Sequence, residues 1–221
     1  MKNVQSTPCG IEPELIDAIE NPNLNELISD VGELALDSVL TDGLLREIPV
    51  INTLVNLGGI FVSLRERIYA TKVLSFLQPI SKIPEKERKD FAQKLRSEEE
   101  FKKFSETVFM LIDRMENRSQ ATVSGAIMEA HIKGKVSYET AVRMCSMVTR
   151  AHVSDLRYLK TFIDGVQGKN DMIAEALFSA GFISNGGIDG GTVGVPDSSG
   201  TIFVLNDYGR AIRDIGALDY L

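Results

Sequence analysis

The feature that most constrains this fold is an uncharged run at residues 48–64, which ends abruptly at the Arg-Glu-Arg triplet 65–67. A helix that spans a bilayer needs about twenty predominantly apolar residues, so this run approaches the required length without reaching it. Its content argues against a straight, lipid-facing helix, because Pro49 stands near its start and the pair Gly58-Gly59 lies at its centre. A buried position in a protein core is therefore the preferred interpretation.

The glycine pair predicts a break between two short apolar helices that pack as a buried hairpin within residues 44–78. The second helix is expected to begin near Gly59 and to stop at Gln78, since Pro79 disfavours its continuation. Membrane insertion stays open as a second state, because arginines at the exit of an apolar run can meet anionic headgroups. The side chains that would contact a membrane or a partner are Ile48, Val50, Ile51, Leu54, Val55, Leu57, Ile60, Phe61, Arg65 and Arg67.

The composition is that of a cytoplasmic protein. The chain of 221 residues can bury a core without disulfides, and its two cysteines, Cys9 and Cys145, are expected to be free thiols. The N-terminal stretch has no apolar segment of the length that a secretory signal needs. The net charge is -7, and from Asp155 onward nine acidic residues stand against five basic ones. This acidity disfavours binding to nucleic-acid phosphates, which depends mainly on lysine and arginine.

Much of the chain shows the three-and-four spacing of apolar residues that is typical of amphipathic helices. One helix is predicted after Ser97, which with the acids that follow it forms a capping-box pattern ahead of Phe101. Another is predicted to start at Ser137 and to continue without a break to Leu159. We therefore expect a mainly α protein with an antiparallel multi-helix body over residues 1–162.

The last quarter of the chain has a different pattern. A short helix is predicted at residues 171–180, glycines crowd residues 184–200, an apolar strand follows at 201–205, and Asn206 can cap a final helix. Helix, glycine-rich excursion, strand and helix is the order of a winged-helix C-terminal half. We expect a small winged-helix-like α+β domain over residues 163–221, in which the glycine-rich segment is the wing.

Two sets of segments resemble known families. The strings LFSAGFI (177–183) and IFVLNDYGRAIRDIGAL (202–218) resemble the end of many bacterial winged-helix domains. Segments 42–77 and 111–159 resemble a family of uncharacterised bacterial helical proteins that share an apolar segment followed by an arginine-rich helix start. The resemblance implies a bacterial or phage origin and raises the expectation of a role in bacteria–phage conflict. It implies no catalytic residue, since that family has no named activity.

No cofactor or metal is expected. His131, Cys145 and His152 could approach one another on neighbouring helix faces, but no fourth ligand completes a zinc set, so they are interpreted as core residues. The glycine-rich segment lacks the Gly-Lys-Ser/Thr ending of a phosphate-binding loop and precedes a strand. The charged block at residues 81–103 mixes both signs and is interpreted as solvated helical surface.

The preferred function is a non-enzymatic adaptor or regulator that recognises a partner protein through helix faces and the wing, with a homo-oligomer as a further option. One alternative is a winged-helix nucleic-acid-binding regulator, which needs basic side chains gathered on one surface. Its candidate contacts are Lys160, Lys169, Arg210 and Arg213. A second alternative is a membrane-acting helical effector that uses residues 48–64.

Overall fold

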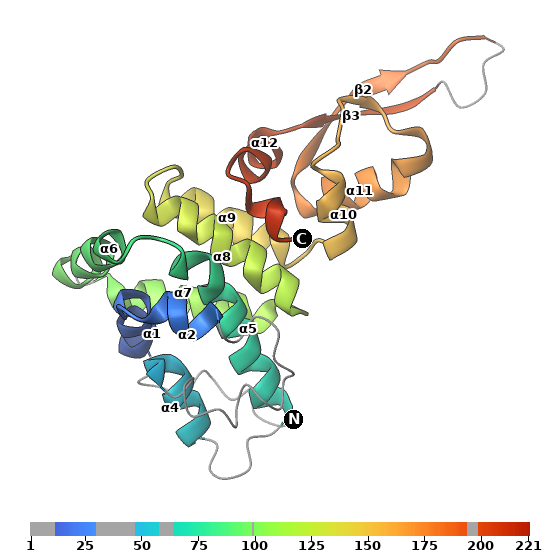
Figure 1. The fold of residues 1–221 in the computed structure, drawn as a ribbon. Coiled ribbons are helices and arrows are strands. Elements are labelled where there is room, and N and C mark those ends of the chain that lie inside the picture. The colour runs from blue at the N-terminus through green and yellow to red at the C-terminus, as the bar shows by residue number, and fades with distance from the viewer. Residues whose placement is uncertain (1–11, 30–46, 58–63, 99, 194–198) are drawn as a thin grey trace.

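The computed structural model describes residues 12–29, 47–57, 64–98, 100–193 and 199–221. Within them the protein is mainly helical and has one small antiparallel sheet of three strands (Figure 1). The α-helices are α1 (Glu12–Glu20), α2 (Leu24–Ser29), α4 (Pro49–Leu57), α5 (Leu64–Ser81), α6 (Glu85–Ser97), α7 (Phe101–Arg114), α8 (Arg118–Ile132), α9 (Tyr138–Val148), α10 (Val153–Tyr158), α11 (Asp171–Ala180) and α12 (Asp207–Asp214). The strands are β1 (Gly165–Val166), β2 (Ile183–Asp189) and β3 (Gly200–Leu205), and two 3-10 turns are η2 (Gly168–Asn170) and η3 (Ala217–Tyr220).

The helical part is organised around the contact between α5 and α8, which is the most extensive between any two helices. Residues 120–128 of α8 are all buried, and many of them are small. At Gly125 the two backbones come so close that a Cβ atom would lie 2.0 Å from the Phe76 carbonyl oxygen of α5. Glycine is therefore required at this position by the approach of α5. Helix α9 packs against α8, while α1 contacts α4, α6 and α7.

Three cationic side chains bind the carbonyl groups at helix C-termini. Arg88 of α6 is buried and donates to Ile19 O (2.5 Å) and Asn21 O (2.7 Å) at the end of α1. Its Nε also donates to Ile83 O at 3.1 Å. These carbonyls carry the negative end of the helix dipole and have no partner within their own helix, so a cation stabilises them.

The same arrangement occurs twice more in the described part of the chain. Lys72 of α5 is buried and donates from Nζ to Met115 O, 2.8 Å away, directly after α7. Burial lowers the pKa of Lys72, and nearby Asp113 partly opposes that shift. Arg150 donates to Ala180 O, the last residue of α11, at 3.0 Å. Each cation thus joins the end of one helix to a different part of the chain.

The apolar segment forms two separate helices, α4 and α5, which contact each other. The prediction that the second helix stops at Gln78 is wrong, because α5 continues through Pro79 to Ser81. Pro79 lies in the last turn, so its missing N–H removes only one helical hydrogen bond. The turn that follows is closed by Lys82 N donating to Pro79 O (3.2 Å). The predicted helix start near Gly59 and the glycine pair lie outside the described residues.

Two helix boundaries differ from the sequence prediction. Ser97 does not form a capping box; it is the last residue of α6, and its Oγ donates to Lys94 O (2.8 Å). The predicted helix exists as α7 and is preceded by Glu100, whose side chain makes no capping hydrogen bond. A serine followed by acids is compatible with either a helix start or a helix end. Here Ser97 ends a helix.

The helix predicted from Ser137 to Leu159 is broken into α9 and α10. Its start is correct, since the Ser137 Oγ accepts a hydrogen bond from Thr140 N (3.1 Å). The break is stabilised by the buried amide of Gln120 on α8. Its Nε2 donates to the carbonyl oxygens of Val148 (3.1 Å) and Ala151 (3.0 Å). A side chain from another helix therefore satisfies the carbonyls that the interruption exposes.

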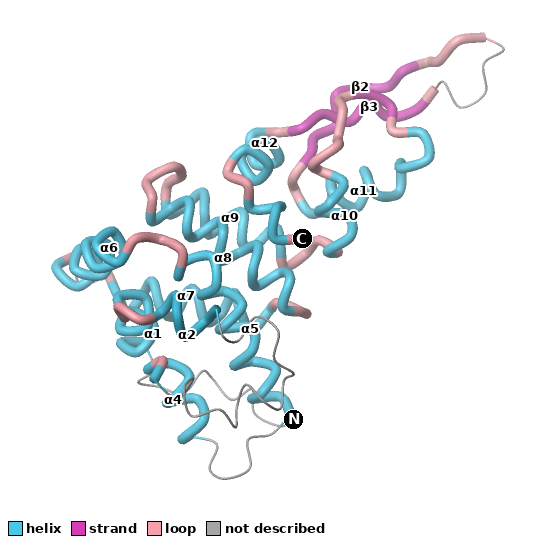
Figure 2. The backbone as a smooth tube through the Cα atoms, in the orientation of Figure 1, coloured by secondary structure: helices cyan, strands magenta, loops and turns pink. Residues whose placement is uncertain are grey.

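The sheet has the order β1-β3-β2, and both neighbouring pairs are antiparallel. Helix α11 has the predicted bounds and ends at Gly181, whose φ of 103° is accessible mainly to glycine. The β2–β3 register shifts between Asn185 and Gly187, so the glycine-rich segment begins as a bulged strand. Figure 2 shows β2 and β3 extending away from the helices of the body. Residues 163–221, with this sheet, α11 and α12, are called the C-terminal unit below.

The end of the C-terminal unit returns to the helical body. Turn η3 contacts α8 and α12, and its Ala217 and Leu218 are buried. Tyr220 adds polar contacts, since its hydroxyl lies 3.5 Å from Glu129 Oε2 of α8 and its ring lies under Lys82 Nζ at 4.5 Å. The C-terminal unit therefore contacts the body at η3 as well as through the chain that follows α10.

Replacing Gly125 by alanine should destabilise the protein by about 2 to 4 kcal/mol, because the new methyl group must separate α5 from α8. Urea unfolding measures this loss. Gly190→Ala is the matched control: nothing lies within 4 Å of a Cβ at that position, so stability should change by less than about 0.5 kcal/mol. Equal effects of the two substitutions would contradict the close approach.

Replacing Arg88 by methionine should cost about 3 kcal/mol or more, because three carbonyl groups lose their buried donor. Lysine cannot reproduce the fork of the guanidinium and should restore only part of the loss. The control is Lys89→Met, which removes an exposed ion pair with Glu85 and should cost less than about 1 kcal/mol. Urea midpoints of the variants give the comparison, and an Arg88→Met protein as stable as Lys89→Met would refute it.

Candidate functional site

The apolar segment directs its described side chains into the core. Ile48, Val50 and Ile51 are buried, and Leu54 is half-buried against the same core. Val55 and Leu57 belong to the last part of α4, whereas Ile60 and Phe61 lie outside the described residues. Arg65 is exposed at the start of α5, and Arg67 is half-buried one residue after Glu66. In the described ranges, no helix combines the length and the apolar character needed to cross a bilayer.

Three of the four basic candidates in or next to the C-terminal unit lie beside acids. Lys160 Nζ is 3.1 Å from Asp219 Oδ1, and Arg213 Nε is 3.6 Å from Asp214 Oδ1. Arg210 lies 3.1 Å from Asp207 Oδ1. Lys169 is exposed in η2. The intramolecular carboxylates offset the positive charge that a phosphate-binding surface would need.

Helix α11 precedes the β2–β3 hairpin, and its exposed side chains are apolar, neutral polar or acidic. It contains no lysine or arginine, and its acidic residues are Asp171 and Glu175. Ala174, Leu177 and Ala180 are buried against the sheet and neighbouring helices. A helix without cations is poorly suited to the major groove of DNA, where phosphate and base contacts come mainly from basic and amide side chains.

Exposed apolar side chains are concentrated in the C-terminal unit. Of the eight large hydrophobic residues that are exposed in the described ranges, five lie between residues 163 and 193. The exposed fraction is 84% for Met172 and 82% for Ile188. We call these five the C-terminal apolar set: Ile163, Met172, Phe178, Ile188 and Val193. Apolar side chains held in water on one part of a protein are a feature of interaction sites.

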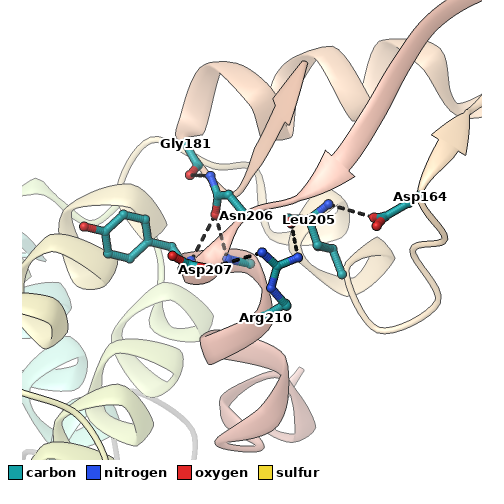
Figure 3. A network of polar contacts seen from close by, with 8 residues as sticks. Asp164, Gly181, Leu205, Asn206, Asp207 and Arg210 are labelled. Carbon is teal, nitrogen blue, oxygen red and sulfur yellow. Dashed lines mark hydrogen bonds and ion pairs between the residues drawn. The ribbon is translucent and has the colours of Figure 1, made fainter. Parts of the chain in front are cut away.

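A polar network fixes the strand that carries this hairpin to the helix that follows it. Figure 3 shows the Asn206 side chain between Gly181 and the start of α12, where its Nδ2 donates to Gly181 O (2.7 Å). Its Oδ1 accepts hydrogen bonds from Tyr208 N and Gly209 N, both at 3.0 Å, which confirms Asn206 as the N-cap of α12. One side chain thus joins the end of α11 to the start of α12.

Two further contacts complete this network (Figure 3). The Asp164 carboxylate accepts a hydrogen bond from Leu205 N at 2.8 Å, and the Arg210 guanidinium donates to Leu205 O. Arg210 therefore has a structural position at the end of β3, in addition to its contact with Asp207. The base of the hairpin is held by the side chain of Asp164 and by side chains at the start of α12, so the hairpin is presented from a fixed base.

His131, Cys145 and His152 do not come together as a metal site. His131 lies 3.1 Å from Val136 O through Nδ1, and His152 is exposed with Nδ1 2.6 Å from Ser154 Oγ. Cys145 is fully buried, and its Sγ lies 3.6 Å from Ser124 O. Burial raises the pKa of the Cys145 thiol from 9.0 to about 12. No group of three metal-binding side chains gathers anywhere in the described ranges.

The structure has a second surface feature that the sequence does not indicate. It is a cleft of about 530 Å³ between α6, the start of α7 and the α8–α9 turn. Phe91, Phe104, His131 and Tyr138 contribute to its lining. Each belongs to a different helix, so their spacing in the chain gives no signal of their proximity. The sequence interpretation makes His131 a core residue, and the structure places it half-buried among aromatic rings.

Comparison of the chain with protein-family models, curated proteins and solved structures gives no match. The resemblances to bacterial winged-helix domains and to helical bacterial proteins therefore stay predictions. What the sites can do must be argued from their own geometry.

The buried thiol gives a pH-dependent prediction. In a Cys9→Ser variant, Cys145 should resist thiol reagents at about pH 8 in the native protein and react once urea unfolds it. Between about pH 9 and 11 the unfolded thiol ionises while the native thiol keeps its proton, so the free energy of unfolding should fall as pH rises.

The matched control for this prediction is Cys9→Ser/Cys145→Ala. It retains the tyrosines whose pKa is also raised, such as Tyr220, so any difference between the two unfolding curves reports the thiol. Identical alkaline slopes, or rapid native labelling of Cys145, would refute the assignment of Cys145 to a water-excluded core.

Proposed function

We propose that the protein is a non-enzymatic adaptor or regulator that recognises a partner protein through its C-terminal unit. The observation that carries the proposal is the C-terminal apolar set, which keeps large apolar side chains in water before β1, on α11, on β2 and just after β2. Protein interfaces are depleted of charge at their centre and enriched in methionine and aromatic residues, which matches the exposed Met172 and Phe178. The network around Asn206 supports this role because a fixed hairpin loses little entropy on binding.

A winged-helix nucleic-acid-binding regulator is the second candidate. The helix–hairpin order of α11, β2 and β3 and the sheet order β1-β3-β2 favour it. The charges oppose it, because α11 has no cation and Lys160, Arg210 and Arg213 lie beside carboxylates. We therefore propose that the winged-helix-like C-terminal unit contacts a protein and not a nucleic acid.

Membrane action through residues 48–64 is less favoured. It would require Ile48, Val50 and Ile51 to leave the core. Their departure would leave a cavity in the core, which destabilises the remaining fold. A cytoplasmic location, a role in bacteria–phage conflict and self-association into a homo-oligomer belong to the same proposal as predictions.

The test is affinity capture from the source organism with three baits: the wild type, Met172→Glu/Ile188→Glu, and Ile68→Glu/Met110→Glu. The last pair also replaces exposed apolar residues, but on α5 and α7 of the body. We expect one partner to be enriched by the wild type and by the body variant and to be reduced about ten-fold or more with the C-terminal variant, measured by quantitative mass spectrometry.

Binding to mixed duplex DNA provides the opposing measurement. The proposal expects no binding at about 0.15 M salt, whereas tight binding that weakens steeply with salt would favour the nucleic-acid regulator. Equal capture of the partner by all three baits would contradict recognition through the C-terminal apolar set.

A further inference from the structure

Four rings from four helices line the cleft between α6 and the α8–α9 turn, and they contact one another in a closed circuit. The Phe91 centroid lies 5.5 Å from that of Phe104 and 5.7 Å from that of His131, with interplanar angles of 72° and 85°. Tyr138 closes the circuit at 5.9 Å from Phe104 and 5.5 Å from His131. The two contacts of Tyr138 are tilted, at 34° and 49°. Phe104 is buried, so the partly exposed rings of Phe91, His131 and Tyr138 are the ones whose electron-rich faces a ligand can meet.

The turn between α8 and α9 fixes two of these rings. Gly134 adopts a φ of 71°, and the reversed chain brings Val136 and Tyr138 back beside the end of α8. The carbonyl oxygen of Val136 can only accept, so His131 donates to it from Nδ1 at 3.1 Å. The imidazole orientation is therefore set by the protein before any ligand arrives.

The rim of the cleft carries an excess of negative charge. Four carboxylates line it against two ammonium groups, a formal balance of minus two; the acids are Glu87, Asp90, Glu98 and Glu100, and the bases are Lys94 and Lys103. All six side chains are exposed. Among the described residues, none of the four acids forms an ion pair. The rim therefore attracts cations and has carboxylates available to bind them.

One polar group within the aromatic lining lacks a partner. The Tyr138 hydroxyl oxygen is buried and completes no hydrogen bond within the described residues. The Thr107 side chain lies near this hydroxyl and opposes the rise in the pKa of Tyr138 that burial causes. Because this oxygen has almost no exposed surface, a ligand in the cleft meets the ring of Tyr138 and not its hydroxyl.

We propose that this cleft binds an arginine side chain presented by a peptide segment of a partner protein. A guanidinium is planar, stacks on aromatic faces and binds carboxylates in pairs. The volume of about 530 Å³ also favours arginine, because it admits a long stem with a flat head and exceeds the size of a bare ammonium group. The cleft lies on the helical body, so the proposal does not depend on the C-terminal unit.

The experiment titrates the full-length protein with the peptide acetyl-Gly-Arg-Gly-amide and follows the ring signals of His131 and Tyr138 by NMR. A single side chain should bind with a Kd on the order of 1 mM. The control peptide replaces arginine by citrulline, which keeps the shape and loses the charge, and it should bind at least about five-fold more weakly. Tetramethylammonium is the second probe and should bind more weakly than the arginine peptide.

Variants test the lining directly. Glu98→Gln/Glu100→Gln should weaken arginine-peptide binding about five-fold, and Phe91→Leu should do the same while keeping an apolar side chain. The matched control is Glu106→Gln/Glu175→Gln, which removes two exposed acids that do not line the cleft and should leave Kd unchanged. Circular dichroism and urea midpoints confirm that each variant is folded.

Each contrary outcome is decisive. Absence of signal changes up to about 20 mM peptide, or equal binding of the citrulline peptide, would overturn the proposal. Tighter binding of tetramethylammonium than of arginine would assign the cleft to small quaternary cations instead. Loss of partner capture by the C-terminal variant together with unchanged arginine binding would support both surfaces separately. Unchanged partner capture together with unchanged arginine binding would leave only the cleft, and loss of arginine binding in that variant would overturn an independent cleft.

Discussion

The structure depends first on the buried guanidinium of Arg88. Removing this group from water is costly, and three carbonyl groups offset the cost while the Glu85 carboxylate adds a smaller electrostatic stabilisation. Two of the carbonyls close α1, which in turn contacts α4 and α7. Because Arg88 fixes α6 against α1, it also sets the position of Phe91 three residues later, on a helix face that meets α7 and α8. A single hydrogen-bonding group thus supports both the core and one wall of the aromatic cleft.

Local signals in the sequence predict the parts of the fold that are determined locally. The bounds of α11, the N-cap at Asn206 and the N-cap at Ser137 follow from side chains that contact their own neighbourhood. Arg88 could not be distinguished from the other charges in residues 81–103, because its burial depends on where α1 ends in space. The break between α9 and α10 was missed for the same reason, since Gln120 stabilises it from another helix.

In the candidate sites too, some features follow from local sequence and others depend on tertiary packing. The composition of the C-terminal unit indicated that nucleic acid is a poor ligand, and the positions of Lys160, Arg210 and Arg213 beside acids add a geometric reason. Which apolar residues stay in water could not be read from the pattern, because Met172 and Leu177 look equivalent until the sheet covers one of them. The aromatic cleft forms only when four helices pack together, so no single stretch of sequence could predict it.

The return of η3 to α8 has a mechanical consequence for the C-terminal unit. A domain joined to its neighbour by one peptide linker can swivel about that linker, whereas a domain joined at two separated points cannot. Here the chain after α10 is one attachment, and the burial of Ala217 and Leu218 against the body, the packing of α12 on α9 and the Arg150 hydrogen bond to Ala180 O are others. These attachments limit rotation of the C-terminal unit about its linker, and η3 places Tyr220 beside Glu129 of α8, within one helical turn of the histidine that lines the cleft.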